Sequence, residues 1–310
     1  MKIISLFSGV GGLDLGLIQA GNIVVWANDI DIDAVGTYSK NIGKHIICSD
    51  IKNIDISTIP IADIVVGGFP CQGFSQANLL RKVEDERNQL YKFFFKIVKK
   101  KQPKFFIAEN VRGILSIAGG GIIKQIVSDF ENAGYIVTVT LVNMANYGVP
   151  QIRQRVFIIG QHKNLGKVML FQFPKKTHGK NGNPQPWVSI KTALKHYPNP
   201  DKPNKCLNHI YSSYKVEYRN FTGHRATDPN KPSPTILARG NGKGGVCAIP
   251  HYNGKRRLTI RESATIQTFP EKFEFIGRMN SCYRQIGNAV PVQFAKLLGK
   301  ELVRLEQDVL

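Results

Sequence analysis

The chain has 310 residues, of which 42% are hydrophobic and 21% charged. This length suffices for two domains with a sizeable core, and the composition is that of a globular protein. The five cysteines are scattered and form no C-x-x-C pair, which argues against a disulfide framework and against a zinc site. No apolar run is long enough to cross a membrane, and the first residues resemble a strand rather than a signal peptide. We therefore expect a soluble, intracellular protein without a bound metal.

The net charge of +20 is concentrated in one part of the sequence. Residues 161–257 hold 18 Lys and Arg against 3 Asp and Glu, a balance of +15, whereas the other residues hold 24 against 19, a balance of +5. A generally basic protein would spread its charge more evenly. The basic segment therefore predicts a polyanionic partner, most simply nucleic acid.

The first 160 residues alternate between strand and helix patterns. Short apolar runs predict strands at 3–7, 23–27, 45–48, 63–67, 105–108, 135–142 and 155–159. Apolar residues at helical spacing predict helices at 13–20, 34–41, 87–100 and 122–133. This alternation predicts a mainly parallel α/β sheet covered by helices on both faces, with an antiparallel position open to the last strand.

The composition changes after Gly160. Ten of the sixteen prolines lie between Pro174 and Pro250, among many Asn and Gly residues and little helical periodicity. This pattern predicts a second, irregular region of short strands and loops. Helical spacing returns at 259–267 and 293–310.

One cysteine follows a predicted buried strand directly. The stretch from Asp63 to Ser75 starts as an apolar run, breaks at two glycines and presents Cys71 after Pro70. The carboxyl end of such a strand is where α/β enzymes present reactive groups, and the proline stiffens the approach. A buried cysteine that merely packs in the core is the alternative, and this stretch alone does not separate the two.

Polar residues follow the neighbouring predicted strands. A glycine-rich turn spans residues 7–12, Asp29 ends the second strand and Asp50 follows the third. Each aspartate alone reads equally well as a turn or helix cap. Together they suit an adenosine-bearing cofactor without a diphosphate, since the turn lacks the G-x-G-x-x-G spacing.

Charged residues also follow the later strands. Glu109 stands at the carboxyl end of the fifth strand, beside the thiol if the strand order is simple. A carboxyl group there could move a proton, although a turn cap is the commoner role. Arg153 and Arg155 face one side if their segment is extended, and could then hold an anion; a solvated edge strand is the alternative.

Six motifs in order resemble those of the DNA cytosine-5 methyltransferases of bacterial and phage restriction–modification type. They lie at Phe7–Gly12, Gly67–Gln72, Glu109–Val111, Gln151–Arg155, Arg257–Pro270 and Gln285–Val290. The resemblance covers nearly the whole chain. It implies an α/β fold, the Rossmann-like doubly wound sheet of S-adenosylmethionine-dependent methyltransferases with a smaller, β- and loop-rich target-recognition domain. The implied division is a catalytic and cofactor-binding domain at 1–164, the recognition domain at 165–256 and a return to the catalytic domain at 257–310.

The resemblance also implies a reaction. The methyl group of S-adenosylmethionine would pass to C5 of a cytosine flipped out of a specific duplex DNA sequence, leaving S-adenosylhomocysteine. The Cys71 thiolate would add to C6, and Glu109 would hydrogen-bond N3 and the amino group. Arg155, with Arg153, would hold O2.

Further residues are carried over from the family motifs. The expected cofactor ligands are Phe7, Gly9, Gly11, Gly12, Asp29, Ile30, Asp50, Ile51, Pro70, Leu90, Asn288 and Ala289. The residues expected at DNA are Ser75, Arg225, Arg239 and Lys243, and residues 78–88 resemble a mobile loop that closes over DNA. Ile30 stands where many relatives have a tryptophan, so its contact with adenine would be aliphatic.

Two other functions fit parts of the pattern. A relative that methylates tRNA would share the motifs, but the long basic insert argues against it. A non-catalytic nucleic-acid-binding protein would not need Cys71, Glu109 and both arginines intact. We expect double-stranded DNA as the partner of a cytoplasmic, nucleoid-associated monomer. No obligate protein partner is expected, and a restriction endonuclease encoded nearby is a possible companion.

Overall fold

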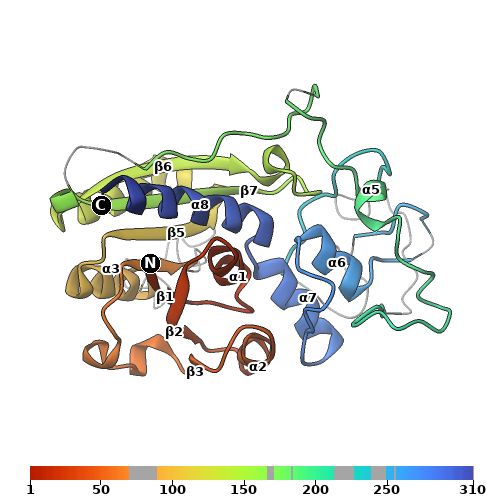
Figure 1. Ribbon diagram of the computed structural model, residues 1–310, viewed down its shortest axis with the longest axis horizontal. Coiled ribbons are helices and arrows are strands. Elements are labelled where there is room, and N and C mark those ends of the chain that lie inside the picture. Colours follow the sequence, from red (N-terminus) through yellow and green to blue (C-terminus); the bar gives the residue numbers. More distant parts are fainter. Residues whose placement is uncertain are drawn as a thin grey trace.

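The computed structural model describes residues 1–69, 89–165, 171–182, 184–212, 227–238, 249–254 and 256–309. Its centre is a seven-stranded sheet with the order β3-β2-β1-β4-β5-β7-β6 (Figure 1). The strands are β1 (Lys2–Leu6), β2 (Ile23–Asp29), β3 (Ile46–Cys48), β4 (Ile64–Gly67), β5 (Phe105–Val111), β6 (Tyr135–Asn143) and β7 (Gln154–His162). Strands β1 to β5 pair in parallel, whereas β7 is antiparallel to both β5 and β6. The expected mainly parallel sheet is thus confirmed, including an antiparallel place for the last strand.

The helices are α1 (Gly12–Gln19), α2 (Ile32–Asn41), α3 (Gln89–Lys101), α4 (Gly121–Asn132), α5 (Ile190–Leu194), α6 (Ile260–Ile266), α7 (Met279–Asn288) and α8 (Val292–Val309). All the strands and helices expected from apolar spacing are present, with ends that differ by a few residues. Helices α5 and α7 were not expected. In the described part of the irregular region the backbone forms α5 and isolated bridges, not the short strands expected there.

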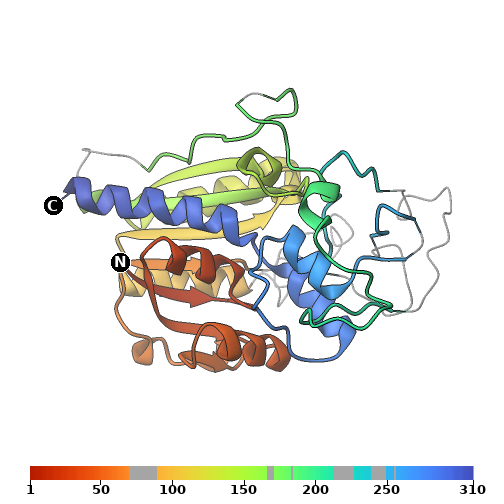
Figure 2. The same ribbon diagram turned by 45° about the vertical axis from the view of Figure 1, so that its right-hand side comes forward.

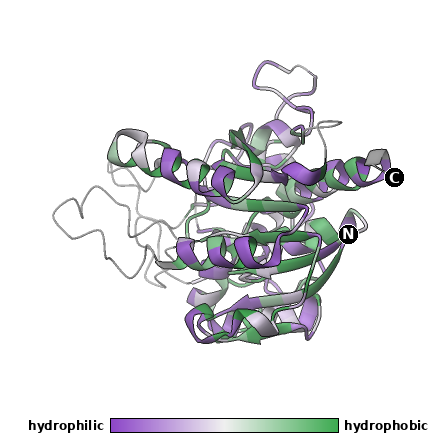
Figure 3. Cartoon of the chain, turned by 90° about the vertical axis from the view of Figure 1, so that its left-hand side faces the viewer, coloured by the Kyte–Doolittle hydropathy of each residue, from purple (hydrophilic) through white to green (hydrophobic). Residues whose placement is uncertain are grey.

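Helices cover both faces of the sheet because adjacent strand residues point to opposite sides. Ile3 of β1 belongs to a core cluster with Leu17 of α1 and Leu298 of α8. Ile4, its neighbour, belongs to a second cluster with Phe94 of α3 and Phe130 of α4. Colouring by hydropathy shows the apolar strands between these helical layers (Figure 3). No helix in the described ranges is long and apolar enough to span a membrane.

The C-terminal part of the chain returns to the sheet. Helix α8 packs along α1. Both views show α8 lying across the sheet, with α6 and α7 between it and the irregular region (Figures 1 and 2). A capping box starts α6: Thr259 accepts from the Glu262 N–H, and the Glu262 carboxylate accepts from the Thr259 N–H. The same carboxylate accepts two hydrogen bonds of 2.7 Å from the buried Arg256 guanidinium. This pairing fixes the end of the irregular region to the first turn of α6.

Candidate active site and cofactor pocket

The carboxyl ends of the parallel strands bring several motif residues to one edge of the sheet. Strands β4 and β5 are direct neighbours, with Gly67 opposite Ala108. Glu109 therefore lies beside the segment that leaves β4: a Cβ on Gly68 would be 3.2 Å from its Oε2 atom. The buried Asn110 side chain donates a hydrogen bond of 3.0 Å to the carbonyl of Phe69. The expected adjacency of Glu109 to the strand leading toward the thiol is thus present.

Six of the residues chosen from the sequence lie outside the described residues, and so does the segment 78–88. The six are Pro70, Cys71, Ser75, Arg225, Arg239 and Lys243. The structure therefore describes the nucleophile motif only as far as Phe69.

Glu109 forms an ion pair with Arg155. Arg155 lies on β7, where it pairs with Val111 of β5. Its Nε atom is 2.9 Å from Glu109 Oε1, and the two side chains are only 13% and 12% exposed. The N–H bond is not aligned with this oxygen, which has no hydrogen-bond partner among the described residues. The carboxylate is thus held by charge while retaining a lone pair for a further donor.

Arg153 has different surroundings from Arg155. Its side chain is 1% exposed, and it donates hydrogen bonds of 3.0 Å to the carbonyls of Ile236 and Gly287. Burial, and then the nearby Arg155 charge, lower its pKa to about 9. Strand β7 starts at Gln154, and Arg153 lies directly before it. The two guanidinium groups share no hydrogen-bond partner among the described residues.

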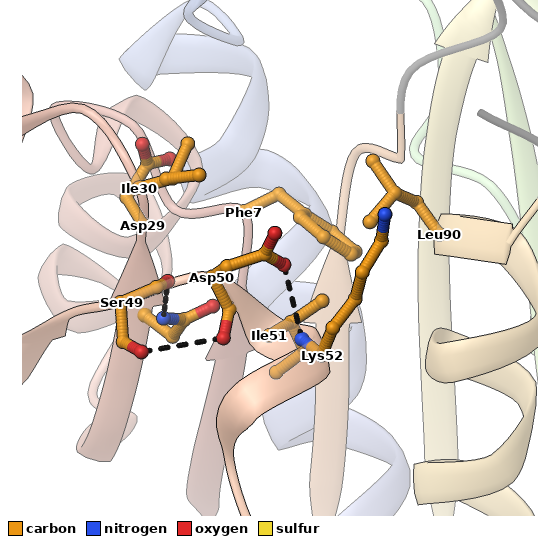
Figure 4. Close-up of a pocket in the computed structure, with 9 residues that line it drawn as sticks. Phe7, Asp29, Ile30, Ser49, Asp50, Ile51, Lys52 and Leu90 are labelled. Carbon is orange, nitrogen blue, oxygen red and sulfur yellow. Dashed lines mark hydrogen bonds between the residues drawn. The ribbon is translucent and has the colours of Figure 1, made fainter. Parts of the chain in front are cut away.

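A pocket lies at the other end of the same sheet edge (Figure 4). Of the residues expected to bind the cofactor, it is lined by Phe7, Asp29, Ile30, Asp50, Ile51 and Leu90. They come from the ends of β1, β2 and β3 and from the start of α3, which are far apart in the sequence. An apolar wall with two carboxylates suits the flat base and the ribose hydroxyls of an adenosine group.

The glycine-rich turn is tied to this pocket by hydrogen bonds. Gly9 (φ 55°) donates its N–H to Asp29 Oδ2 at 2.7 Å, and Asp31 donates its N–H to Oδ1 at 2.9 Å. Burial raises the pKa of Asp29, although these backbone donors oppose the rise. Phe7 also has a positive φ of 54°, which is uncommon for a residue with a side chain and typical of functional turns.

Asp50 combines the two roles that the sequence left open. Its Oδ1 atom accepts from the Lys52 N–H at 3.0 Å and so caps a short 3-10 turn, Ile51–Asn53. The same residue lines the pocket. A capping aspartate is thereby held at the pocket wall.

The last motif, Gln285–Val290, packs against the glycine-rich turn from the side opposite the pocket. A Cβ on Gly12 would be 2.4 Å from the Val290 carbonyl oxygen and 3.1 Å from the Ala289 Cβ. Gly11 (φ 79°) precedes α1 in a left-handed conformation, and Asn288 is the final residue of α7. The turn and the last motif are therefore in contact, although Asn288 and Ala289 do not line the described pocket.

Three pocket residues were not expected from the sequence. They are Asn28, Ser49 and Lys52. The Asn28 amide donates to the carbonyls of Ile47 and Ser49, and so joins the ends of β2 and β3. In the sequence, the three residues lie next to Asp29 or within two residues of Asp50, and this proximity could have indicated that they line the same pocket.

Comparison with known proteins identifies what this arrangement resembles. Residues 1–304 match the model of the C-5 cytosine-specific DNA methylase family. The Type II methyltransferase M.NgoFVII of Neisseria gonorrhoeae is 40% identical over 332 residues, which cover 99% of this chain and 87% of that protein. M.MthTI of Methanothermobacter thermautotrophicus is 34% identical, covering 100% of this chain and 99% of that protein.

Solved structures agree with the fold. A crystal structure from E. coli, described as a prophage-encoded DNA modification methyltransferase, superposes with a TM-score of 0.75 at 27% identity and covers 99% of both chains. The Dnmt2 methyltransferase of S. pombe gives a TM-score of 0.72 at 20% identity, again over 99% of both chains. At that identity the second match supports the fold alone.

Proposed function

Because the chain belongs to the family of C-5 cytosine-specific DNA methylases, we propose that it methylates C5 of a cytosine flipped out of a specific duplex DNA sequence. S-adenosylmethionine is the cofactor, and it supplies the electrophilic methyl group. The observation that carries the proposal is the Glu109–Arg155 pair, which lies beside Gly68 at the edge of the sheet that also holds the adenosine-type pocket.

The residues of the chain supply the activation that cytosine needs. C5 is a poor nucleophile, so the Cys71 thiolate forms a bond to C6 and places electron density on C5. The Glu109 carboxyl group, protonated from solvent, gives its proton to N3 as negative charge develops on the ring; the carboxylate that results accepts from the amino group and pairs with Arg155. Arg155 holds O2 while keeping its ion pair with Glu109. After C5 has gained the methyl group, solvent water takes the C5 proton, the C5–H electron pair forms the C5=C6 double bond, and the C6–S bond breaks to release the thiolate. The N3 proton returns to Glu109.

The division of the chain follows from the same proposal. Residues 1–164 and 257–310 form the catalytic and cofactor-binding domain, and residues 165–256 recognise the target sequence. Ser75, Arg225, Arg239 and Lys243 lie at the DNA. This division is supported by the packing of α8 on α1 and by the charge of +15 on residues 161–257. We also propose that the bound cofactor contacts Gly9, Gly11 and Gly12 of the glycine-rich turn, together with Pro70, Asn288 and Ala289.

Methyl transfer from labelled cofactor tests the proposal. We expect label on C5 of cytosine in duplex DNA, none on tRNA, and none with Cys71→Ser. A duplex with 5-fluorocytosine at the target should trap a covalent complex, because that base has no C5 proton to lose. Label on tRNA with inert DNA would replace this function with the tRNA alternative, and transfer to neither substrate would favour a non-catalytic nucleic-acid-binding protein.

The biological setting is part of the proposal. We expect a monomer that acts on DNA in the cytoplasm, associated with the nucleoid, alongside a restriction endonuclease of the same specificity. Relatives named as Type II methyltransferases support this setting. Light scattering of the purified protein tests the monomer, and bisulfite sequencing of DNA from expressing cells identifies the target sequence.

A further inference from the structure

A short segment of the irregular region is attached to the arginine motif by several hydrogen bonds. We call residues 233–238 the docking segment. The Ile152 N–H donates to the Ser233 carbonyl at 2.9 Å, and the Thr235 hydroxyl donates to the Ile152 carbonyl at 2.6 Å. The Ile236 N–H donates to Gln151 Oε1 at 2.9 Å. These bonds set the segment beside the strand that carries Arg155.

Arg153 links this segment to the last motif. One nitrogen of its guanidinium donates to the carbonyl of Ile236 and the other to the carbonyl of Gly287, both at 3.0 Å. The two backbones are in close contact there, since a Cβ on Gly287 would be 2.4 Å from the Leu237 carbonyl carbon. Arg153 therefore links its own segment to two others, which lie 83 and 134 residues away in the sequence.

Gln151 and Gln267 form a second link beside the first. Gln151 Nε2 donates to Gln267 Oε1 at 2.9 Å, and Gln267 Nε2 donates to the carbonyls of Ile286 and Ala289. The last motif thus keeps its hydrogen bonds to Gln267 if Arg153 is replaced. The docking segment would lose its charged donor.

We infer that Arg153 is a positioning residue that fixes the docking segment against the last motif, and that Arg155 alone is the arginine in contact with the cytosine. Both terminal nitrogens of Arg153 are used on backbone carbonyls, and its side chain is buried. A planar guanidinium reaches the two carbonyls with two separate nitrogens, whereas lysine would have to reach both from a single nitrogen. In the sequence the docking segment is followed directly by Arg239 and Lys243, two of the residues proposed to contact DNA, so we expect its loss from this site to weaken DNA binding.

This inference rests on the proposed function, and an abasic duplex separates the two arginines. We would use a duplex with the target sequence found by bisulfite sequencing, and a second duplex with an abasic site in place of the target cytosine. Arg153→Lys should raise the Kd of both duplexes by about 10-fold or more, as expected for loss of a charge-assisted hydrogen bond. Arg155→Gln should leave the Kd of the abasic duplex within about 3-fold and slow only adduct formation with 5-fluorocytosine.

Controls keep the inference open to refutation. The Kd of S-adenosylhomocysteine should stay within about 3-fold in Arg153→Lys, because Gln267 still holds the last motif. Thr235→Val removes an exposed hydrogen bond of the docking segment with little risk to folding. It should raise the Kd of both duplexes, as Arg153→Lys does. Unchanged binding of the abasic duplex in these variants would overturn the inference, and a slowed adduct step in Arg153→Lys would then make Arg153 a ligand of the base. If the starting protein failed to methylate DNA, the proposed function itself would be at fault.

Discussion

Arg155 Nε lies 2.9 Å from Glu109 Oε1, across the antiparallel pairing of β7 and β5. Antiparallel pairing lets a residue late in the arginine motif meet a residue at the carboxyl end of a parallel strand. Strand β7, which lies between β5 and β6, thus brings Arg155 to the edge at which the parallel strands end. A flipped base held there would meet a carboxyl group and a guanidinium fixed to each other.

Replacing the carboxyl group should affect the chemical step and not binding. We expect Glu109→Gln to lower the single-turnover rate of methyl transfer by about 100- to 1000-fold, because the amide cannot supply a proton to N3. The Kd of duplex DNA should stay within about 3-fold, since the side chain keeps its size. The exposed Glu271 offers the same substitution on the surface, and Glu271→Gln should leave the rate unchanged. A normal rate in Glu109→Gln would remove this residue from the mechanism.

The sheet and the surroundings of Glu109 could be predicted because they depend on local patterns. Apolar runs gave the strands, and consecutive parallel strands such as β4 and β5 usually lie side by side. Helix α7 was missed, although Met279, Cys282, Tyr283 and Ile286 stand at helical spacing and pack in the core. Its buried face includes Gln285, which accepts from the Thr37 hydroxyl at 2.8 Å and donates to the Ile276 carbonyl. The sequence pattern does not reveal these hydrogen bonds to distant residues, which add to the apolar packing of that face.

The partners of Arg153 could not be predicted from the sequence. Its spacing from Arg155 suggests a shared face, but its partners are two backbone carbonyls in remote parts of the chain. Carbonyl groups occur at every residue, so the sequence does not mark which of them will accept. Gly287 gives only a weak hint, because close backbone contact is one of several reasons for a glycine.

Asp29 should be required for cofactor binding. Its two oxygens hold the N–H groups of Gly9 and Asp31, and so shape the turn beside the pocket. Asp29→Asn places an N–H₂ group opposite one of these donors, which costs about 1–3 kcal/mol, or roughly 5- to 150-fold in the Kd of S-adenosylhomocysteine. Calorimetric titration with S-adenosylhomocysteine measures this Kd. The exposed Asp55 also caps a 3-10 turn, and Asp55→Asn should bind the product normally.

The contact between α1 and α8 should be sensitive to a single methyl group. A Cβ on Gly16 would be 2.4 Å from the Ala295 Cβ and 2.5 Å from the Val292 carbonyl oxygen, so one helix must move. We expect Gly16→Ala to lower the free energy of unfolding by about 1–3 kcal/mol. Gly36 of α2 is a matched control, because its Cβ would meet only the Ile276 side chain at 3.8 Å. Gly36→Ala should stabilise the helix by about 0.5–1 kcal/mol. Urea unfolding should therefore show a lower free energy of unfolding for Gly16→Ala and a higher one for Gly36→Ala.

A buried carboxyl group behind the glycine-rich turn makes stability depend on pH. Asp14 is 1% exposed and accepts from the Ser5 hydroxyl at 2.7 Å and from the Tyr38 hydroxyl at 2.9 Å. Tyr38 in turn contacts His45 Nε2 at 3.0 Å. Burial raises the pKa of Asp14 from 3.8 to about 6, although both hydroxyl donors oppose the rise. The folded protein therefore binds a proton here that the unfolded chain has already released.

Because the folded pKa of Asp14 is the higher one, its contribution to stability is full below about pH 4 and is lost as the pH rises through about 6. The difference between the two pKa values corresponds to about 3 kcal/mol at most. Asp14→Asn removes the charge, and Tyr38 can accept from the new amide and donate to His45. We expect this variant to gain stability relative to the starting protein between pH 5 and pH 7.5, measured by urea unfolding. Asp55→Asn should differ from the starting protein by a constant amount over this range, since hydrogen bonds from Ser57 lower the pKa of Asp55 and its carboxyl group stays ionised. A difference between Asp14→Asn and the starting protein that does not change with pH would show that Asp14 stays charged throughout.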